Sequence, residues 1–198
     1  KMSKSLGNFF TLRDLIDKGY SGREIRYVLI AGQYRQPLNF TFDALTAARS
    51  ALGRIDEFVS LAKEKADAST ASGTPPAWVV QALDAFGAAL DDDLNMAEAL
   101  AAVHLLVGQG NKEAATGKLD AHTASQVLAA IAKMDTVLNV LHRPEAEIPS
   151  EVLALVDKRA LARKTKLWAE SDSLRDEIAQ LGWTVKDTPQ GQKLSQNR

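Results

Sequence analysis

The chain has 198 residues, of which 45% are hydrophobic and 25% charged, as is typical of a globular protein with one domain or two small ones. Its net charge of −1 excludes a chain-wide attraction to nucleic acid, so any such binding must come from a local basic patch. Cysteine is absent, which excludes disulfides and thiol chemistry here, and no apolar run approaches the roughly 18 residues of a membrane span.

The first eight residues, Lys-Met-Ser-Lys-Ser-Leu-Gly-Asn, combine two lysines, two hydroxyl side chains and a glycine that can adopt a positive φ. Ammonium groups and backbone N–H donors in such a loop can surround a polyphosphate. The alternative is a lysine-rich terminus without a ligand. The string resembles the signature loop of class I aminoacyl-tRNA synthetases, which binds ATP during amino-acid activation. Because the chain opens inside this motif, we expect it to be the later part of a larger protein.

Two short helices are predicted next. The pairs Thr11–Asp14 and Ser21–Glu24 have the spacing of capping boxes, in which a hydroxyl and a carboxylate satisfy each other's backbone N–H groups. Glycines are the expected stops. Residues 34–40 contain a proline and are expected to be extended.

Residues 41–141 are predicted to form an antiparallel four-helix bundle, because four amphipathic segments follow one another with short connections. Thr41 and Asn95 are expected to cap the first and third helices, and residues 68–76 to form a linker. The acidic run 91–93 could bind a cation or favour a helix N-terminus, and we favour the second because further ligands at metal spacing are missing. Glycines expected to bracket a polar loop are Gly108, Gly110 and Gly117.

The histidines have no spacing that suggests a metal site, and no metal site is expected in this chain. His104 lies among apolar helix residues and is interpreted as a hydrogen-bonded structural residue.

Residues 142–149 contain two prolines and two glutamates and are predicted to form a linker. Residues 150–198 are predicted to form a small α/β domain. Its helices are expected at about 150–168 and 170–181, with a short strand over 183–185.

The strongest local charge pattern lies within residues 158–175. On a helix, one face begins apolar and becomes basic, so we expect it to present cations outward, with Trp168 at its end. Cations beside an aromatic ring can hold phosphates and stack on unpaired bases. The alternative is a solvated basic face with Trp168 buried. The basic residues of this segment are Lys158, Arg159, Arg163, Lys164, Lys166 and Arg175.

Motifs along essentially the whole chain resemble, in order, those of bacterial cysteinyl-tRNA synthetases. Residues 34–40 resemble the segment that links the catalytic core to the helical domain, and residues 91–99 resemble that family's acidic helix junction. The C-terminal pattern is the closest. It consists of Arg159, Ala162, Arg163, Lys164, Lys166, Trp168, Asp172, Arg175, Asp176, Gly182 and residues 187–191.

The resemblance implies a mainly α fold. Residues 1–40 would hold the ATP loop and a stem-contact segment, 41–141 a tRNA-binding helical bundle of the DALR type, and 150–198 an anticodon-binding domain. It implies ATP contacts from Lys1, Met2, Ser3, Lys4 and Ser5, with Lys4 as the catalytic side chain that stabilises phosphate charge.

The implied partners are ATP, cysteine and tRNA-Cys, and we expect a cytoplasmic monomer without membrane contacts. The family's zinc ligands are expected in a missing N-terminal half, so this fragment alone is predicted to be inactive. The implied anticodon contacts are Arg163, Trp168, Asp172 and Asp187, within a nucleic-acid-binding set that adds Arg159, Lys164, Lys166 and Arg175.

Two departures from the family pattern stand out. Residues 192–194 replace a frequent aromatic residue, which leaves the last strand open, and Asn95-Met96 replaces a frequent Asn-Thr-Pro helix start. Three other interpretations stay open: another class I synthetase such as the methionine enzyme, a non-enzymatic RNA-binding or helical module, and the related ligase that joins cysteine to a sugar.

Overall fold

The structure is a computed structural model that describes residues 10–66, 73–142, 148–188 and 191–196. The predicted ATP loop lies outside these residues, as do most of the predicted linker 68–76 and the middle of the predicted linker 142–149. The chain divides into two compact units, an N-terminal unit of Lys1–Arg143 and a C-terminal unit of Pro144–Arg198. Helices dominate both, so the predicted mainly α fold is confirmed.

Two short helices begin the described part of the N-terminal unit: α1 (Leu12–Asp17) and α2 (Gly22–Ala31). Both begin with the predicted capping boxes. The Thr11 N–H donates to the Asp14 carboxylate at 2.7 Å, and the Ser21 N–H donates to the Glu24 carboxylate at 2.8 Å. These caps satisfy backbone donors that a helix start leaves without partners.

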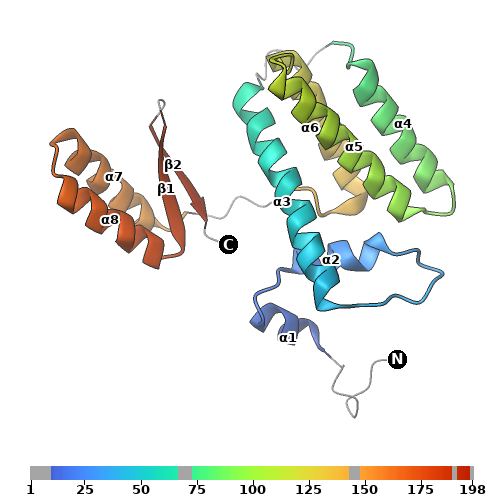
Figure 1. Cartoon of the computed structure of the whole chain (residues 1–198), viewed down its shortest axis with the longest axis horizontal. Coiled ribbons are helices and arrows are strands. Elements are labelled where there is room, and N and C mark those ends of the chain that lie inside the picture. Colours follow the sequence, from blue (N-terminus) through green and yellow to red (C-terminus); the bar gives the residue numbers. More distant parts are fainter. Residues whose placement is uncertain (1–9, 67–72, 143–147, 189–190, 197–198) are drawn as a thin grey trace. The chain divides into compact units, whose positions relative to one another are not determined.

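Four longer helices form the predicted bundle: α3 (Phe42–Lys65), α4 (Ala77–Asp91), α5 (Met96–Ala115) and α6 (Ala121–Leu138). Successive helices run in opposite directions, as Figure 1 shows. The hydroxyl of Thr41 accepts from the N–H of Ala44, and the side chain of Asn95 accepts from the N–H of Glu98, as the predicted caps require.

The core of the N-terminal unit lies between these helices and extends onto α2, whose Ile25, Tyr27 and Val28 are buried with it. The bundle and the segment before it therefore share one hydrophobic core. The apolar positions of α3 that follow the 3.6-residue period are mostly buried; they are Leu45, Ala48, Leu52, Ile55, Val59 and Ala62. Val59 is the exception, since it is half-buried while the neighbouring Phe58 is 1% exposed.

Two of the three glycines expected to bracket a loop lie inside α5. The predicted polar loop from Gly108 onward is wrong, because the helix continues through Gly108 and Gly110 as far as Ala115. The physical reason lies in packing: the Phe58 ring of α3 lies directly against Gly110, so a Cβ atom there would overlap it. Gly117, with φ +72°, does form a turn.

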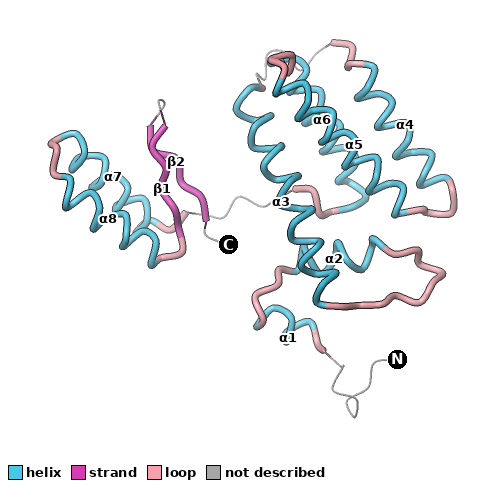
Figure 2. Tube along the Cα trace, viewed as in Figure 1, coloured by secondary structure: helices cyan, strands magenta, loops and turns pink. Residues whose placement is uncertain are grey.

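The C-terminal unit contains α7 (Ser150–Lys164), α8 (Trp168–Gln180) and a hairpin of β1 (Trp183–Thr188) and β2 (Gly191–Gln196). Figure 2 shows the antiparallel strands and the two helices of this unit. Its small core consists of Val152, Ile178, Trp183 and Val185, with Leu155, Val156 and Leu194 packed on it.

The boundary between the two helices differs from the prediction. The first helix ends at Lys164 rather than 168, and Lys166 adopts φ +61°. Trp168 therefore begins α8 instead of ending the preceding helix. A left-handed residue between two helices turns the chain sharply, and no simple 3.6-residue pattern signals it.

Candidate nucleic-acid interface

Arg159 lies in the middle of α7, and its side chain has no exposed surface. Its two terminal nitrogens each donate to one oxygen of the Asp187 carboxylate, both at 3.0 Å, and one also donates to the side-chain oxygen of Gln192. The expectation that α7 presents all its cations to solvent is wrong for Arg159. A buried guanidinium needs an anionic partner, and Asp187 at the end of β1 supplies it.

Arg163 lies one helical turn after Arg159 and is half-buried. One of its terminal nitrogens is 3.4 Å from the Asp187 carboxylate. Its guanidinium carbon lies 5.8 Å from the centre of the Trp168 ring, within the range of a cation–π contact. Trp168 is 56% exposed, which contradicts the alternative that it is buried. Asp187, Arg163 and Trp168 thus form a connected polar and aromatic face.

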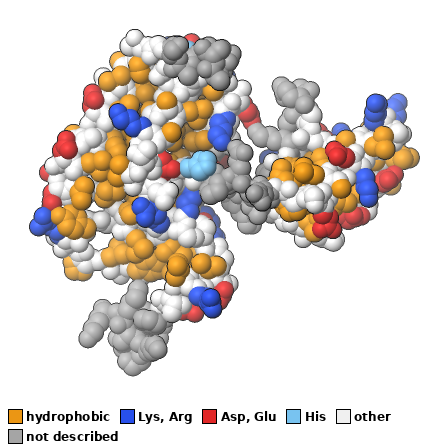
Figure 3. Space-filling view, turned by 180° about the vertical axis from the view of Figure 1, so that it is seen from behind, with side chains coloured by type: hydrophobic (Ala, Val, Ile, Leu, Met, Phe, Trp, Pro, Cys, Tyr) orange, Lys and Arg blue, Asp and Glu red, His pale blue; other side chains and the backbone are white. Residues whose placement is uncertain are grey.

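The other predicted binding residues are close in the chain to Arg163 and Trp168, and they lie at the surface. Lys164, Lys166, Asp172 and Arg175 are all exposed. Arg175 is 3.6 Å from Asp172, the ordinary geometry of a surface ion pair one turn apart on α8. In Figure 3 both basic and acidic side chains are visible on the C-terminal unit, so this unit does not present a purely basic surface in that view.

The Asp187 carboxylate has a lowered pKa, chiefly because Arg159 donates to its ionised form, and Arg163 and Arg175 add favourable charge. Such a group stabilises the fold fully above its unfolded pKa, and this contribution is lost as pH falls through the folded value. We expect the stability difference between the wild-type chain and Asp187→Asn to be constant near neutral pH and to shrink below about pH 4. Urea unfolding at a series of pH values measures it, and a difference that grew on acidification would contradict this assignment.

In the N-terminal unit, Asp93 ties the loop after α2 to the turn between α4 and α5. It accepts from the Tyr34 hydroxyl at 2.7 Å and pairs with the Arg35 guanidinium at 2.7 Å. These bonds lower the pKa of Asp93. The acidic run therefore does more than favour the N-terminus of α5: Asp91 is the last residue of α4, Asp92 is the C-cap of α4, and Asp93 holds a distant loop.

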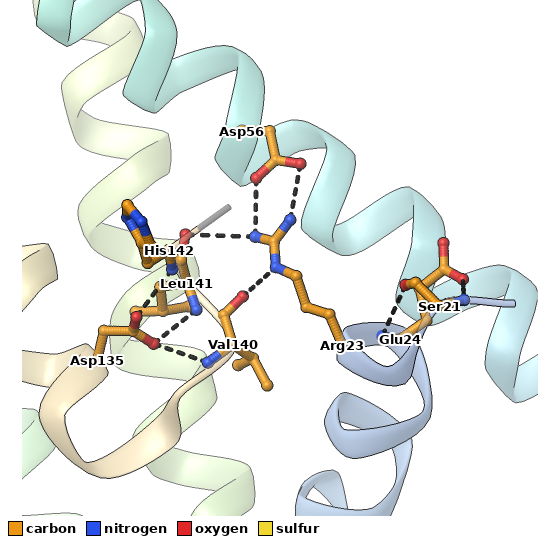
Figure 4. Close-up of polar contacts among 8 residues, drawn as sticks. All are labelled: Ser21, Arg23, Glu24, Asp56, Asp135, Val140, Leu141 and His142. Carbon is orange, nitrogen blue, oxygen red and sulfur yellow. Dashed lines mark hydrogen bonds and ion pairs between the residues drawn. The ribbon is translucent and has the colours of Figure 1, made fainter. Parts of the chain in front are cut away.

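A second polar cluster lies where the chain leaves α6 (Figure 4). Arg23 of α2 donates to both oxygens of Asp56, at 2.7 and 2.9 Å, and to the carbonyl oxygens of Val140 and Leu141. Asp135 accepts from the backbone N–H groups of Val140, Leu141 and His142 at 2.6–2.8 Å. Neither residue has a signal in the sequence, because Arg23 acts on groups far along the chain and Asp135 acts on backbone N–H groups that follow the end of its own helix.

His104 has the structural role predicted for it. Its Nε2 atom lies 2.7 Å from the Tyr27 hydroxyl, and burial lowers its pKa. Among the residues that the structure describes, no three His, Asp or Glu side chains come together as a metal site. No helix in this described part is both long and apolar enough to cross a membrane.

Comparison with protein-family models gives three matches in chain order. Residues 1–50 match the class I (C) catalytic domain of tRNA synthetases. Residues 85–142 match the DALR domain, and residues 145–194 match the anticodon-binding domain of cysteinyl-tRNA ligase. The last match contains the whole face formed by Asp187, Arg163 and Trp168.

Curated relatives match along nearly the whole chain. The cysteine–tRNA ligase of Chlamydia felis is 43% identical over 196 residues, which cover 98% of this chain and 41% of that protein. Those of Chlamydia trachomatis serovar A and Protochlamydia amoebophila are each 40% identical over 98% of this chain, and over 43% and 41% of their own lengths. The chain thus spans about two fifths of the length of these relatives. It belongs to the cysteinyl-tRNA synthetase family, and it contains that family's helical and anticodon-binding domains.

Proposed function

We propose that this chain is the tRNA-binding part of a cysteine–tRNA ligase, which in its complete form activates cysteine with ATP and transfers it to tRNA-Cys. The observation that carries this proposal is the exposed Trp168 beside Arg163 and Asp187, within the segment that matches an anticodon-binding domain. An exposed ring next to a cation and a carboxylate has the chemistry to stack on one base and to bond the edges of others.

Each residue of the face, and the exposed Asp172 on α8, has a distinct chemical role in this proposal. Trp168 stacks on an unpaired base. Arg163 donates to acceptors on a guanine edge, and Asp172 and Asp187 accept from the amino groups of guanine or cytosine. The exposed cations neutralise phosphates and carry no sequence information themselves; they are Lys164, Lys166 and Arg175.

The opening loop has the corresponding role toward ATP. The ammonium groups of Lys1 and Lys4 suit the charge of a triphosphate. In the complete enzyme the cysteine carboxylate would attack the α-phosphorus of ATP, which forms cysteinyl-adenylate and releases pyrophosphate. In this proposal Lys4 stabilises that phosphate charge, and Met2, Ser3 and Ser5 belong to the same ATP-binding motif. Because the chain has no cysteine, we propose that the zinc site implied by the resemblance lies in another part of the enzyme.

The domain organisation follows the same assignment. Residues 1–40 serve as ATP loop and stem-contact segment, 41–141 as helical bundle, 142–149 as linker and 150–198 as anticodon-binding domain. We place the complete enzyme in the cytoplasm as a monomer, and we expect the chain alone to bind tRNA without activating cysteine.

Replacing Trp168 with alanine tests the anticodon role. We expect the wild-type chain to prefer tRNA carrying the GCA anticodon over the same tRNA with a changed anticodon. Trp168→Ala should reduce this preference about tenfold, because without the ring the base is no longer held where Arg163 bonds its edge, and one such contact discriminates by roughly 1–3 kcal/mol. Binding is measured by fluorescence anisotropy at one fixed physiological salt concentration, since phosphate contacts alone give binding at low salt.

The matched control is Leu161→Ala. Leu161 is also apolar and exposed, at 63%, but its position in α7 points about 160° away from Arg159 and from Arg163. It should leave the preference unchanged. Equal wild-type affinity for both tRNAs would reject the anticodon role and leave a general RNA-binding module as the better account.

A further inference from the structure

Arg159 differs from the other basic residues of this segment because its side chain is buried. Within the described residues it is the largest side chain with almost no exposed surface. Its fork of terminal nitrogens is occupied by Asp187 and Gln192, and its Nε atom has no acceptor. A guanidinium enclosed in this way cannot reach a base or a phosphate, so its charge acts only on the groups that surround it.

We infer that Arg159 is a positioning residue, which fixes the Asp187 carboxylate and, through it, Arg163 in the geometry that reads an anticodon base. This inference rests on the function proposed above. The pair is bidentate, with both distances at 3.0 Å, and a fork-to-fork pair fixes the plane of the carboxylate as well as its distance. A carboxylate has about four acceptor sites, so two remain free on the solvent side for Arg163 and for RNA.

Arg159 and Arg163 are four residues apart on α7 and so lie on the same side of the helix. Both approach the Asp187 carboxylate, the first from the interior and the second from the surface. Arg163 in turn contacts the Trp168 ring. The buried Arg159 thus restricts, through Asp187, the rotamers of Arg163 and of the Trp168 ring that Arg163 contacts. Because these side chains are already ordered, they lose less conformational entropy when RNA binds.

Gln192 of β2 completes this arrangement. Its amide oxygen accepts from Arg159, and its amide nitrogen donates to the carbonyl oxygen of Val156 on α7 at 3.4 Å. The side chain therefore bridges the hairpin and the helix beside the buried pair. Gln192 thus gives the Arg159 guanidinium a second acceptor besides Asp187. We therefore infer that Gln192 helps Arg159 to position the Asp187 carboxylate.

The test is Arg159→Lys in the full chain, because lysine keeps the charge but replaces the planar fork with a single ammonium. The probes are two anticodon stem-loop RNAs, one with GCA and one with a single substituted anticodon base, at fixed physiological salt. We expect the preference for GCA to fall about tenfold, since one oriented bidentate contact discriminates by roughly 1–3 kcal/mol. The slope of affinity against salt should stay unchanged, because no phosphate contact is lost.

A second variant and a control separate positioning from simple destabilisation. Gln192→Leu should also lower the preference for GCA, by a smaller factor. If circular dichroism shows that Arg159→Lys does not fold, the result for Gln192→Leu decides whether the positioning role holds. Val152→Ala removes fully buried apolar atoms from the same unit, so it should reduce stability and leave the preference intact.

The outcomes are distinguishable. A folded Arg159→Lys chain with wild-type preference overturns the positioning role, as does an equal loss in Val152→Ala. If the wild-type chain itself does not distinguish the two RNAs, the proposed anticodon function fails first, and the positioning role falls with it.

Discussion

Replacing Arg23 with methionine is expected to lower the free energy of unfolding of the N-terminal unit by about 3 kcal/mol. The side chains of Arg23 and Asp56 are only 16% and 15% exposed. Removing the guanidinium leaves the Asp56 carboxylate without its bidentate partner and takes a donor from the carbonyl oxygens of Val140 and Leu141 (Figure 4). Because these acceptors are largely buried, losing a charged donor costs more here than at an exposed ion pair.

Urea unfolding followed by Trp78 fluorescence measures this effect. Of the three tryptophans, Trp78 packs on the bundle core, and replacing Trp168 and Trp183 with phenylalanine makes it the sole reporter of the N-terminal unit. The matched control is Arg13→Met, an exposed arginine on α1, which should change stability by less than about 0.5 kcal/mol. A loss of similar size in both variants would show that the Arg23 cluster adds no special stability.

Alanine at Gly110 and alanine at Gly108 are expected to act in opposite directions, although both positions lie within α5. Gly110→Ala should destabilise the unit by about 2 kcal/mol, because the new methyl group overlaps the buried Phe58 ring and overpacking a core is costly. Gly108→Ala meets no atom within 4 Å and should stabilise by up to about 1 kcal/mol, since alanine is the better helix former.

The same Trp78 assay measures both variants. Adding Phe58→Leu to Gly110→Ala should recover part of the loss, because the smaller side chain makes room for the methyl group, and a double-mutant cycle gives the coupling between them. Destabilisation by alanine at both glycines, or additive effects of Gly110→Ala and Phe58→Leu, would show that Phe58 is not the cause.

The sequence predicted those elements whose signals are local. Both capping boxes, the caps at Thr41 and Asn95 and the four bundle helices follow from spacings of three or four residues, and the structure contains all of them. The order of the family motifs predicted the family, which the comparisons confirm.

Features that depend on contacts between distant residues could not be predicted in this way. A glycine in a polar stretch is typical of a turn. Gly110 instead lies inside a helix, at a position where the Phe58 ring, 52 positions earlier in the chain, leaves no room for a Cβ atom. Likewise, Arg159 resembles its exposed neighbours in sequence, and its burial depends on Asp187, 28 residues later. Side-chain identity alone cannot separate a cation that meets RNA from one that holds a carboxylate.

The distance along the chain between Arg159 and Asp187 also bears on how the C-terminal unit folds. If α7 and α8 paired before the hairpin docked, Arg159 would be charged without its carboxylate, and it would have to remain in water. We therefore expect the helices and the hairpin of this unit to unfold in a single cooperative transition, because a form in which only the helices pair lacks the carboxylate that makes burial of the Arg159 guanidinium tolerable.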